Sequence, residues 1–207
     1  MRKASAILYR FRGYILALFA VALIAFPAQP LPEKSVPVFP LNSTITSYIC
    51  ASLLLLAGIL LRIHSRRFIG KHTRGSKHEA DELVTTGPYS RTRHPLYISN
   101  TLVACSAIVL HLGFTLPAGV FAVAVILFEF ARAHAEDRFL EERFGETWQN
   151  WARMTPIIPI PFSRKKAPKK AVFPKRTFLQ AFRADCSTWI WIAFFNLILV
   201  SLKTLSL

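Results

Sequence analysis

A cluster of cationic residues stands directly before an apolar run in the middle of the chain. Residues 84–100 read VTTGPYSRTRHPLYISN, so Arg91, Arg93 and His94 precede a stretch long enough to cross a membrane. Pro95 suits the first position of a helix, where its missing N–H costs nothing. Because the helix dipole disfavours cations at a helix amino terminus, an anionic ligand there would relieve the conflict. The alternative is a plain positive flank at the membrane boundary.

A second set of charged residues recurs at helical spacing about forty residues later. Glu129, Arg132 and Glu136 follow one another at three- and four-residue intervals. Glu129 lies near the end of an apolar run, where an ionisable side chain usually faces a cavity or a partner. Asp137 lies on an otherwise apolar helical stripe, where a carboxylate is costly to bury without a cation or hydrogen-bond donors. Either a salt bridge to an arginine of the first set or a bound ligand would satisfy it.

Composition places these residues in a helical membrane protein. The 207 residues are 53% hydrophobic and 18% charged, with a formal charge of +15. Apolar residues gather in long blocks between basic segments, which is the pattern of a multi-pass membrane protein and explains the positive charge better than nucleic-acid binding does. The three cysteines have no paired spacing, so they indicate neither a disulfide framework nor a metal site. We therefore expect an all-α membrane bundle without a nucleic-acid partner.

Five apolar stretches predict about five transmembrane helices. They cover residues 13–26, 45–63, 96–112, 118–130 and 187–202. The first also resembles a secretory signal peptide, but FPAQPLP is a poor cleavage site, which favours a retained helix. HLGFTLP is a tight connection, so the third and fourth spans should form an antiparallel hairpin. After them, residues 133–156 predict one amphipathic helix leaving the membrane.

The distribution of lysine and arginine predicts the orientation. Of the 26 basic residues, 24 precede the first span or lie in residues 62–94 and 131–186, which leaves Lys34 and Lys203 on the other side. By the positive-inside rule, the amino terminus and both charged sets should face the cytoplasm.

Two motifs resemble the signatures of a known family. GPYSRTRHPLY and AEDRFLEERFGETWQNWARMTPIIP, in this order around the hairpin, are similar to segments of the integral-membrane methyltransferases. That group includes isoprenylcysteine carboxyl methyltransferase and the phospholipid N-methyltransferases. The resemblance covers residues 83–161, a cofactor-binding core between amino-terminal helices and a loop (1–82) and a basic linker with a last helix (162–207). It implies a cytoplasm-facing pocket for S-adenosyl-L-methionine and a lipid or lipophilic acceptor in the bilayer.

The resemblance also implies roles for individual residues. Those matched to the cofactor-binding positions are Gly87, Tyr89, Arg93, His94, Tyr97, Glu136 and Asp137. Asp137 stands where the family usually has a second glutamate, which keeps the charge and shortens the reach. In the catalytic role, Arg91 or Arg132 could orient an anionic acceptor, and Glu129 or His94 could help an amine acceptor, which must arrive neutral. A carboxylate acceptor needs no general base, and no residue is expected to bind a metal.

Two other readings stay open from the sequence. The tail FGETWQNW is also similar to the carboxyl-terminal half of membrane sterol reductases, which use NADPH. Those enzymes are usually larger and have more spans, so we favour methyl transfer. A non-enzymatic lipid-binding or scaffold protein would keep the bundle without the chemistry. The sequence predicts neither the identity of the methyl acceptor nor the oligomeric state.

Overall fold

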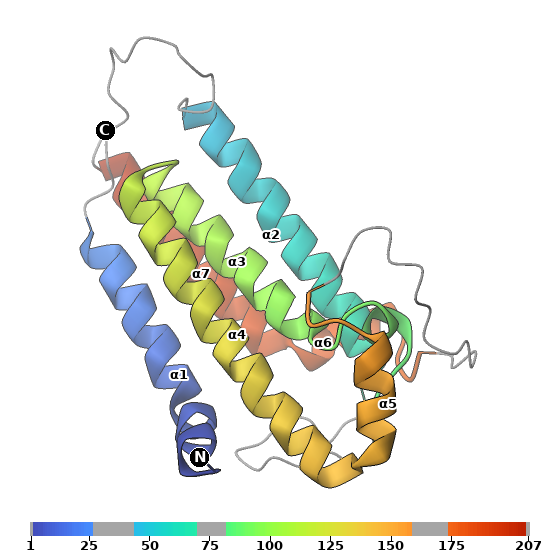
Figure 1. Ribbon diagram of the computed structural model, residues 1–207. Helices are drawn as coiled ribbons and strands as arrows, with labels where there is room; N and C mark the ends of the chain where they lie inside the picture. Colours follow the sequence, from blue (N-terminus) through green and yellow to red (C-terminus); the bar gives the residue numbers. More distant parts are fainter. Residues whose placement is uncertain (1, 27–43, 70–81, 159–173, 206–207) are drawn as a thin grey trace.

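The computed structural model describes residues 2–26, 44–69, 82–158 and 174–205, and within these parts every regular element is helical (Figure 1). The elements are α1 (Arg2–Ala25), α2 (Thr44–Arg66), the 3₁₀ helix η3 (Gly87–Ser90), α3 (Pro95–Leu112), α4 (Leu116–Phe144), α5 (Glu146–Met154), α6 (Phe178–Ala184) and α7 (Cys186–Leu205). The predicted all-α class is confirmed.

The long helices agree with the predicted spans. By length and composition, α2, α3 and α4 are each able to cross a membrane, and α6 with α7 makes a fourth candidate if this pair, bent by 67°, is counted as one span. The apolar part of α1, Gly13–Ala25, is shorter. Large apolar side chains on the outer surface, such as Leu18, Leu53 and Leu127, are more than half exposed, as expected for helices surrounded by lipid.

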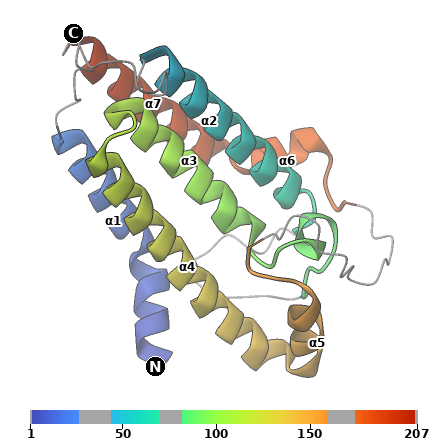
Figure 2. The same cartoon turned by 45° about the horizontal axis from the view of Figure 1, so that its top comes forward.

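The predicted hairpin is present and is bounded by its turn residues. α3 begins at Pro95 and ends at Leu112, and it is followed by Gly113, which has a positive φ of 66°. Thr115 caps α4 by accepting a hydrogen bond from the backbone N–H of Ala118 at 3.3 Å. Both views show α3 and α4 running side by side in opposite directions (Figures 1 and 2). The hairpin therefore returns the chain to the level at which α3 began.

α2 packs closely along α3 through a glycine. A Cβ atom built on Gly58 would lie 2.8 Å from a methyl group of Val103, so only a hydrogen fits there. The Ser99 hydroxyl donates a hydrogen bond to the Gly58 carbonyl at 2.8 Å. Small residues and interhelical hydrogen bonds of this kind hold membrane helices together.

The prediction of one amphipathic helix over residues 133–156 is wrong, because two helices cover this range. α4 continues without a break from the membrane span to Phe144, and a separate helix, α5, begins at Glu146. The break is at Gly145, whose φ of 52° lies in the left-handed region that glycine tolerates best. The turn sends α5 back beside η3, as Figure 1 shows.

The last span also differs from a single straight helix. Asp185, which is fully buried, lies at the bend between α6 and α7. Its Oδ2 accepts hydrogen bonds from Arg62 Nε at 2.8 Å and Arg66 Nε at 3.0 Å. One carboxylate therefore fixes the α6–α7 bend to the end of α2.

Candidate active site

The basic corner before α3 meets the acidic face of α4. Asp137 accepts a hydrogen bond from His94 Nε2 at 2.8 Å on Oδ1, and Arg93 Nη1 lies 3.0 Å from Oδ2. Asp137 and His94 are only 7% and 4% exposed, so water screens the contact little. Of the two alternatives for Asp137, the structure shows the salt bridge, and it is made to Arg93.

The backbone around Arg93 is anchored to the segment after α5. The Arg93 N–H donates to the carbonyl of Pro156 at 2.9 Å, and the Thr92 hydroxyl donates to the carbonyl of Ile157. His94 occupies the N-cap position of α3. The Arg93–His94 corner is therefore fixed from two sides, by α4 through side chains and by the α5 exit through the backbone.

Gly87 and Tyr89 shape the turn that leads into this corner. Gly87 has a φ of 63°, and a Cβ atom there would lie 2.5 Å from the ring of Phe68. The Tyr89 side chain is buried in an apolar cluster with Trp148 and Trp151, and burial raises the pKa of its phenol. Both residues were predicted to bind a cofactor. The structure gives each of them a role in building the turn.

Three buried polar atoms near the corner have no hydrogen-bond partner among the described residues. They are Arg93 Nε, Trp148 Nε1 and Thr155 Oγ1. The Arg93 guanidinium lies 5.6 Å from the centre of the Trp148 ring, and Thr155 directly precedes the Pro156 carbonyl that holds Arg93. Because buried donors normally find partners, three in one region favour a polar ligand there.

Glu136 is the acid of this group that remains accessible. Its side chain is 36% exposed, and its Oε2 lies 4.0 Å from His94 Nδ1. It also forms a hydrogen bond with the hydroxyl of Tyr97, whose ring centre is 5.4 Å from that of His94. Two neighbouring carboxylates thus have different environments, because Asp137 is fully engaged with protein groups and Glu136 is open to a ligand.

A second polar cluster lies deeper in the membrane span. Arg132 Nη1 contacts both oxygens of Glu129, at 2.8 and 2.9 Å, and Glu129 is 3% exposed. The Arg132 guanidinium also lies 4.6 Å from the centre of the Tyr97 ring. Tyr97 therefore connects this cluster to Glu136.

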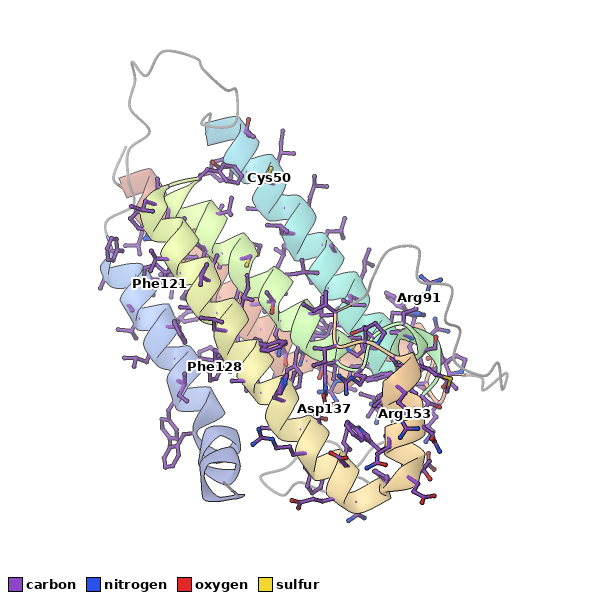
Figure 3. The ribbon with its side chains drawn as sticks, in the orientation of Figure 1. Cys50, Arg91, Phe121, Phe128, Asp137 and Arg153 are labelled. Atoms are coloured by element: carbon purple, nitrogen blue, oxygen red, sulfur yellow. The ribbon has the colours of Figure 1, made fainter. Side chains whose placement is uncertain are left out.

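Two residues that the sequence reasoning did not assign join the deeper cluster. Asn100 hydrogen-bonds to Glu129, and its Oδ1 accepts a hydrogen bond from Arg62 Nη1 at 2.7 Å. Polar residues at the edge of an apolar stretch were the only signal available for them. Arg91, by contrast, is exposed and lies apart from Asp137 (Figure 3). Its role in orienting an acceptor stays a prediction.

Comparison with known proteins relates part of the chain to a methyltransferase family. Residues 46–147, just under half of the chain, match the phospholipid methyltransferase family. The match confirms the expected resemblance to integral-membrane methyltransferases. It begins in α2, well before the first motif, and includes the whole α3–α4 hairpin.

Two relatives are named for metal resistance. The chain is 35% identical over 114 residues to the nickel-cobalt-cadmium resistance protein NccN of Alcaligenes xylosoxydans xylosoxydans, across 54% of this chain and 52% of the relative. It is 37% identical over 103 residues to the cobalt-zinc-cadmium resistance protein CzcN of Cupriavidus metallidurans, across 49% of this chain and 45% of the relative. The chain thus spans about half the length of these curated relatives. No solved structure matches it significantly.

Proposed function

We propose that this protein, which carries the phospholipid methyltransferase region at residues 46–147, uses S-adenosyl-L-methionine to methylate a lipid or lipophilic acceptor. The observation that carries the proposal is the meeting of the Arg93–His94 corner with Glu136 and Asp137 at one end of a membrane hairpin. A zwitterionic cofactor needs cationic and acidic groups side by side, and this corner supplies both.

The residues at the corner fit such a cofactor. The orphaned donors Arg93 Nε, Trp148 Nε1 and Thr155 Oγ1 suit a carboxylate, and the accessible Glu136 suits an ammonium group or ribose hydroxyls. Asp137 then has a positioning role, because its two oxygens hold His94 and Arg93. When bound, the cofactor supplies a methyl group already activated on a positively charged sulfur. The protein therefore has mainly to align the acceptor and to exclude water.

The deeper cluster is suited to the acceptor. Glu129 and Arg132 lie within the membrane helix α4 and are linked to the corner through Tyr97. Arg132 would orient an anionic acceptor, and Glu129 would take the proton of an amine acceptor. With the positive-inside distribution of basic residues, we place the site and the amino terminus on the cytoplasmic side.

The names of the two relatives raise metal resistance as a context. Among the described residues no three His, Cys, Asp or Glu side chains gather as a metal site requires. The proposal therefore rests on the methyltransferase region and its acid–base corner, and the family match favours methyl transfer over the NADPH-dependent reductase alternative.

Isothermal titration of the purified protein in detergent with S-adenosylhomocysteine tests the proposal. We expect saturable binding, weakened at least about tenfold by Glu136→Gln and by His94→Ala, since tenfold corresponds to the loss of one good polar contact. Glu142→Gln, on the exposed side of α4, is the matched control and should bind as the unaltered protein does. Absence of binding to the unaltered protein, or unchanged affinity in both site variants, would overturn the assignment. Binding of NADPH in its place would support the reductase.

A further inference from the structure

A cavity lies inside the helix bundle. Some of the helices around it belong to the family match, and the others lie outside it. Its volume is about 270 Å³, and it is lined by residues of α1, α3, α4 and α7, with Arg62 of α2 at one end. α1 packs against α4 and α7 packs against α3, so the cavity lies between these two helix pairs. α1 and α7 lie outside residues 46–147, so half of the wall is built by parts of the chain that the family match does not cover.

The cavity is long, narrow and polar at one end. On each of the four helices its lining residues span eight or nine positions, for example Asn100 to Ile108 on α3 and Phe121 to Glu129 on α4, which is up to eight helical steps. At 1.5 Å per residue, the cavity is about 12 Å long. Because α3 and α4 run in opposite directions, Asn100 and Glu129 lie at the same end, where Arg62 also lies.

The rest of the lining is almost wholly apolar. The other end is formed by residues such as Leu23, Ile108 and Phe121, and the middle by small residues including Ala104 and Ala107. Thr188 and Asn196, both on α7, are the polar exceptions. The Asn196 amide donates a hydrogen bond to the carbonyl of Ile192 in its own helix at 2.8 Å.

Two lining residues show where the cavity opens. Trp191 of α7 is 68% exposed and Leu16 of α1 is 37% exposed, and both contribute to the cavity wall. Side chains that line a cavity and also face the surroundings stand at its mouth. The mouth therefore faces the lipid between α1 and α7.

We propose that this cavity binds the single hydrocarbon tail of the acceptor, with its polar head at Arg62, Asn100 and Glu129. The length carries this inference, since an extended chain advances about 1.2 Å per bond and the cavity therefore takes a tail of about ten carbons. The volume agrees, because a methylene group is about the size of a water molecule, about 30 Å³, so about nine fit. Two tails side by side do not fit. From the polar end of the cavity, successive contacts connect Glu129 to Arg132, Arg132 to Tyr97 and Tyr97 to Glu136.

The occupant is therefore a single-chain amphiphile, and the inference rests on the proposed function for its identity as methyl acceptor. A diacyl phospholipid has the same head chemistry, but only one of its two tails fits in the cavity. The second tail would have to leave through the mouth between α1 and α7, which splays the two tails apart and should weaken binding. In a bilayer the tail moves from one apolar environment to another, so shape decides the preference more than hydrophobic transfer does.

Native mass spectrometry of the full chain in detergent tests the inference with a matched pair of probes. Monodecanoyl and didecanoyl glycerophosphoethanolamine share one head group and differ in tail number. We expect one monodecanoyl molecule per chain, with an affinity at least about tenfold above that of the didecanoyl probe. Within a monoacyl series, affinity should rise with tail length to about ten carbons and then level off. Equal affinity for the two probes, or no levelling, would overturn the inference.

Variants locate the binding. Ala104→Phe and Ala20→Phe each place a ring in the cavity from a different helix, and each should weaken monodecanoyl binding at least about tenfold. Ala193→Phe is the control, because Ala193 is exposed on α7 and lies outside the lining. Unchanged binding in both cavity variants would refute the assignment, provided that their thermal unfolding is normal. If they unfold early, the tail-length series on the unaltered protein still decides. Binding of S-adenosylhomocysteine is measured separately, so tail binding without cofactor binding would refute the proposed function and leave the cavity's role intact.

Discussion

The contact of Asp137 with Arg93 and His94 gives the sharpest prediction. Asp137→Asn keeps the shape of the side chain and removes its charge. The amide has one oxygen for the two donors that now contact the carboxylate at 2.8 and 3.0 Å, so its NH₂ group must face either Arg93 or His94. The charge-assisted contacts are lost in a site that is 7% exposed. The NH₂ group then meets either the Arg93 guanidinium, which is also a donor, or His94 Nε2, which accepts it only if the imidazole changes tautomer.

The expected loss of stability follows from that geometry. A hydrogen bond to a charged group contributes about 1.5–3 kcal/mol, and breaking a buried ion pair costs about 3–5 kcal/mol. The Arg93 side chain is 15% exposed and keeps some access to water, so we expect about 2–4 kcal/mol in all. For a chain of about this size, each kcal/mol lowers Tm by about 2–4 °C, so Asp137→Asn should lower it by about 5–15 °C.

Tryptophan fluorescence during thermal unfolding in a mild detergent measures the shift, and Trp148 beside Arg93 reports on the site itself. Glu142→Gln, an exposed change on the same helix, should shift Tm by less than about 2 °C. In a double-mutant cycle, Asp137→Asn and His94→Ala should be non-additive by at least about 1 kcal/mol, because they remove the same contact. A Tm within about 2 °C of the unaltered protein, or additive effects, would refute the reasoning.

Three further outcomes follow from the fold. Gly87→Ala should destabilise the protein by about 1–3 kcal/mol in thermal unfolding, because its φ is positive and a Cβ atom would meet the Phe68 ring, whereas Gly119→Ala, with open space around it, should be neutral or stabilising. Asp185→Asn should lower stability by about 3–5 kcal/mol, since the fully buried carboxylate holds two arginines; a loss below about 1 kcal/mol would contradict its role. Burial raises the pKa of Tyr89, so the unfolded chain releases this proton first as pH rises above about 10. Stability should therefore fall above that pH, and Tyr89→Phe should show a smaller fall.

The contact of the Arg93–His94 corner with Asp137 was predictable, because in a hairpin of two helices the distance of a residue from the turn decides its level along the bundle. Antiparallel helices rise equally per residue, so residues at equal distances from the turn lie at one level. His94 precedes Gly113 by 19 residues and Asp137 follows Thr115 by 22, which places them together whatever the packing details. The apolar stretches likewise predicted the helices, because a membrane span has few alternatives to a helix.

The missed features depend on contacts that spacing along the chain does not determine. Arg62 of α2 and Asp185 at the α6–α7 bend are 123 residues apart, and no short loop connects these elements. Their meeting depends on how α2 packs against α6, and an aspartate beside an apolar stretch looks like any boundary residue. The break at Gly145 was missed for a different reason, because the apolar period of the helix continues across it and only the positive φ of the glycine ends α4.

The electrostatic conflict at the start of α3 is resolved within the protein. The Arg93 guanidinium lies at the positive end of the helix dipole, where a cation is disfavoured, and Asp137 supplies the anion that offsets it while also accepting a hydrogen bond from His94. The charge of Arg93 is therefore already balanced and gives little reason to expect a ligand. The reason to expect a ligand is that three groups beside Asp137 are not paired with it. They are Arg93 Nε, the indole N–H of Trp148 and the accessible carboxylate of Glu136. Asp137 thus holds the corner in place, and the groups beside it remain available to recognise a zwitterion.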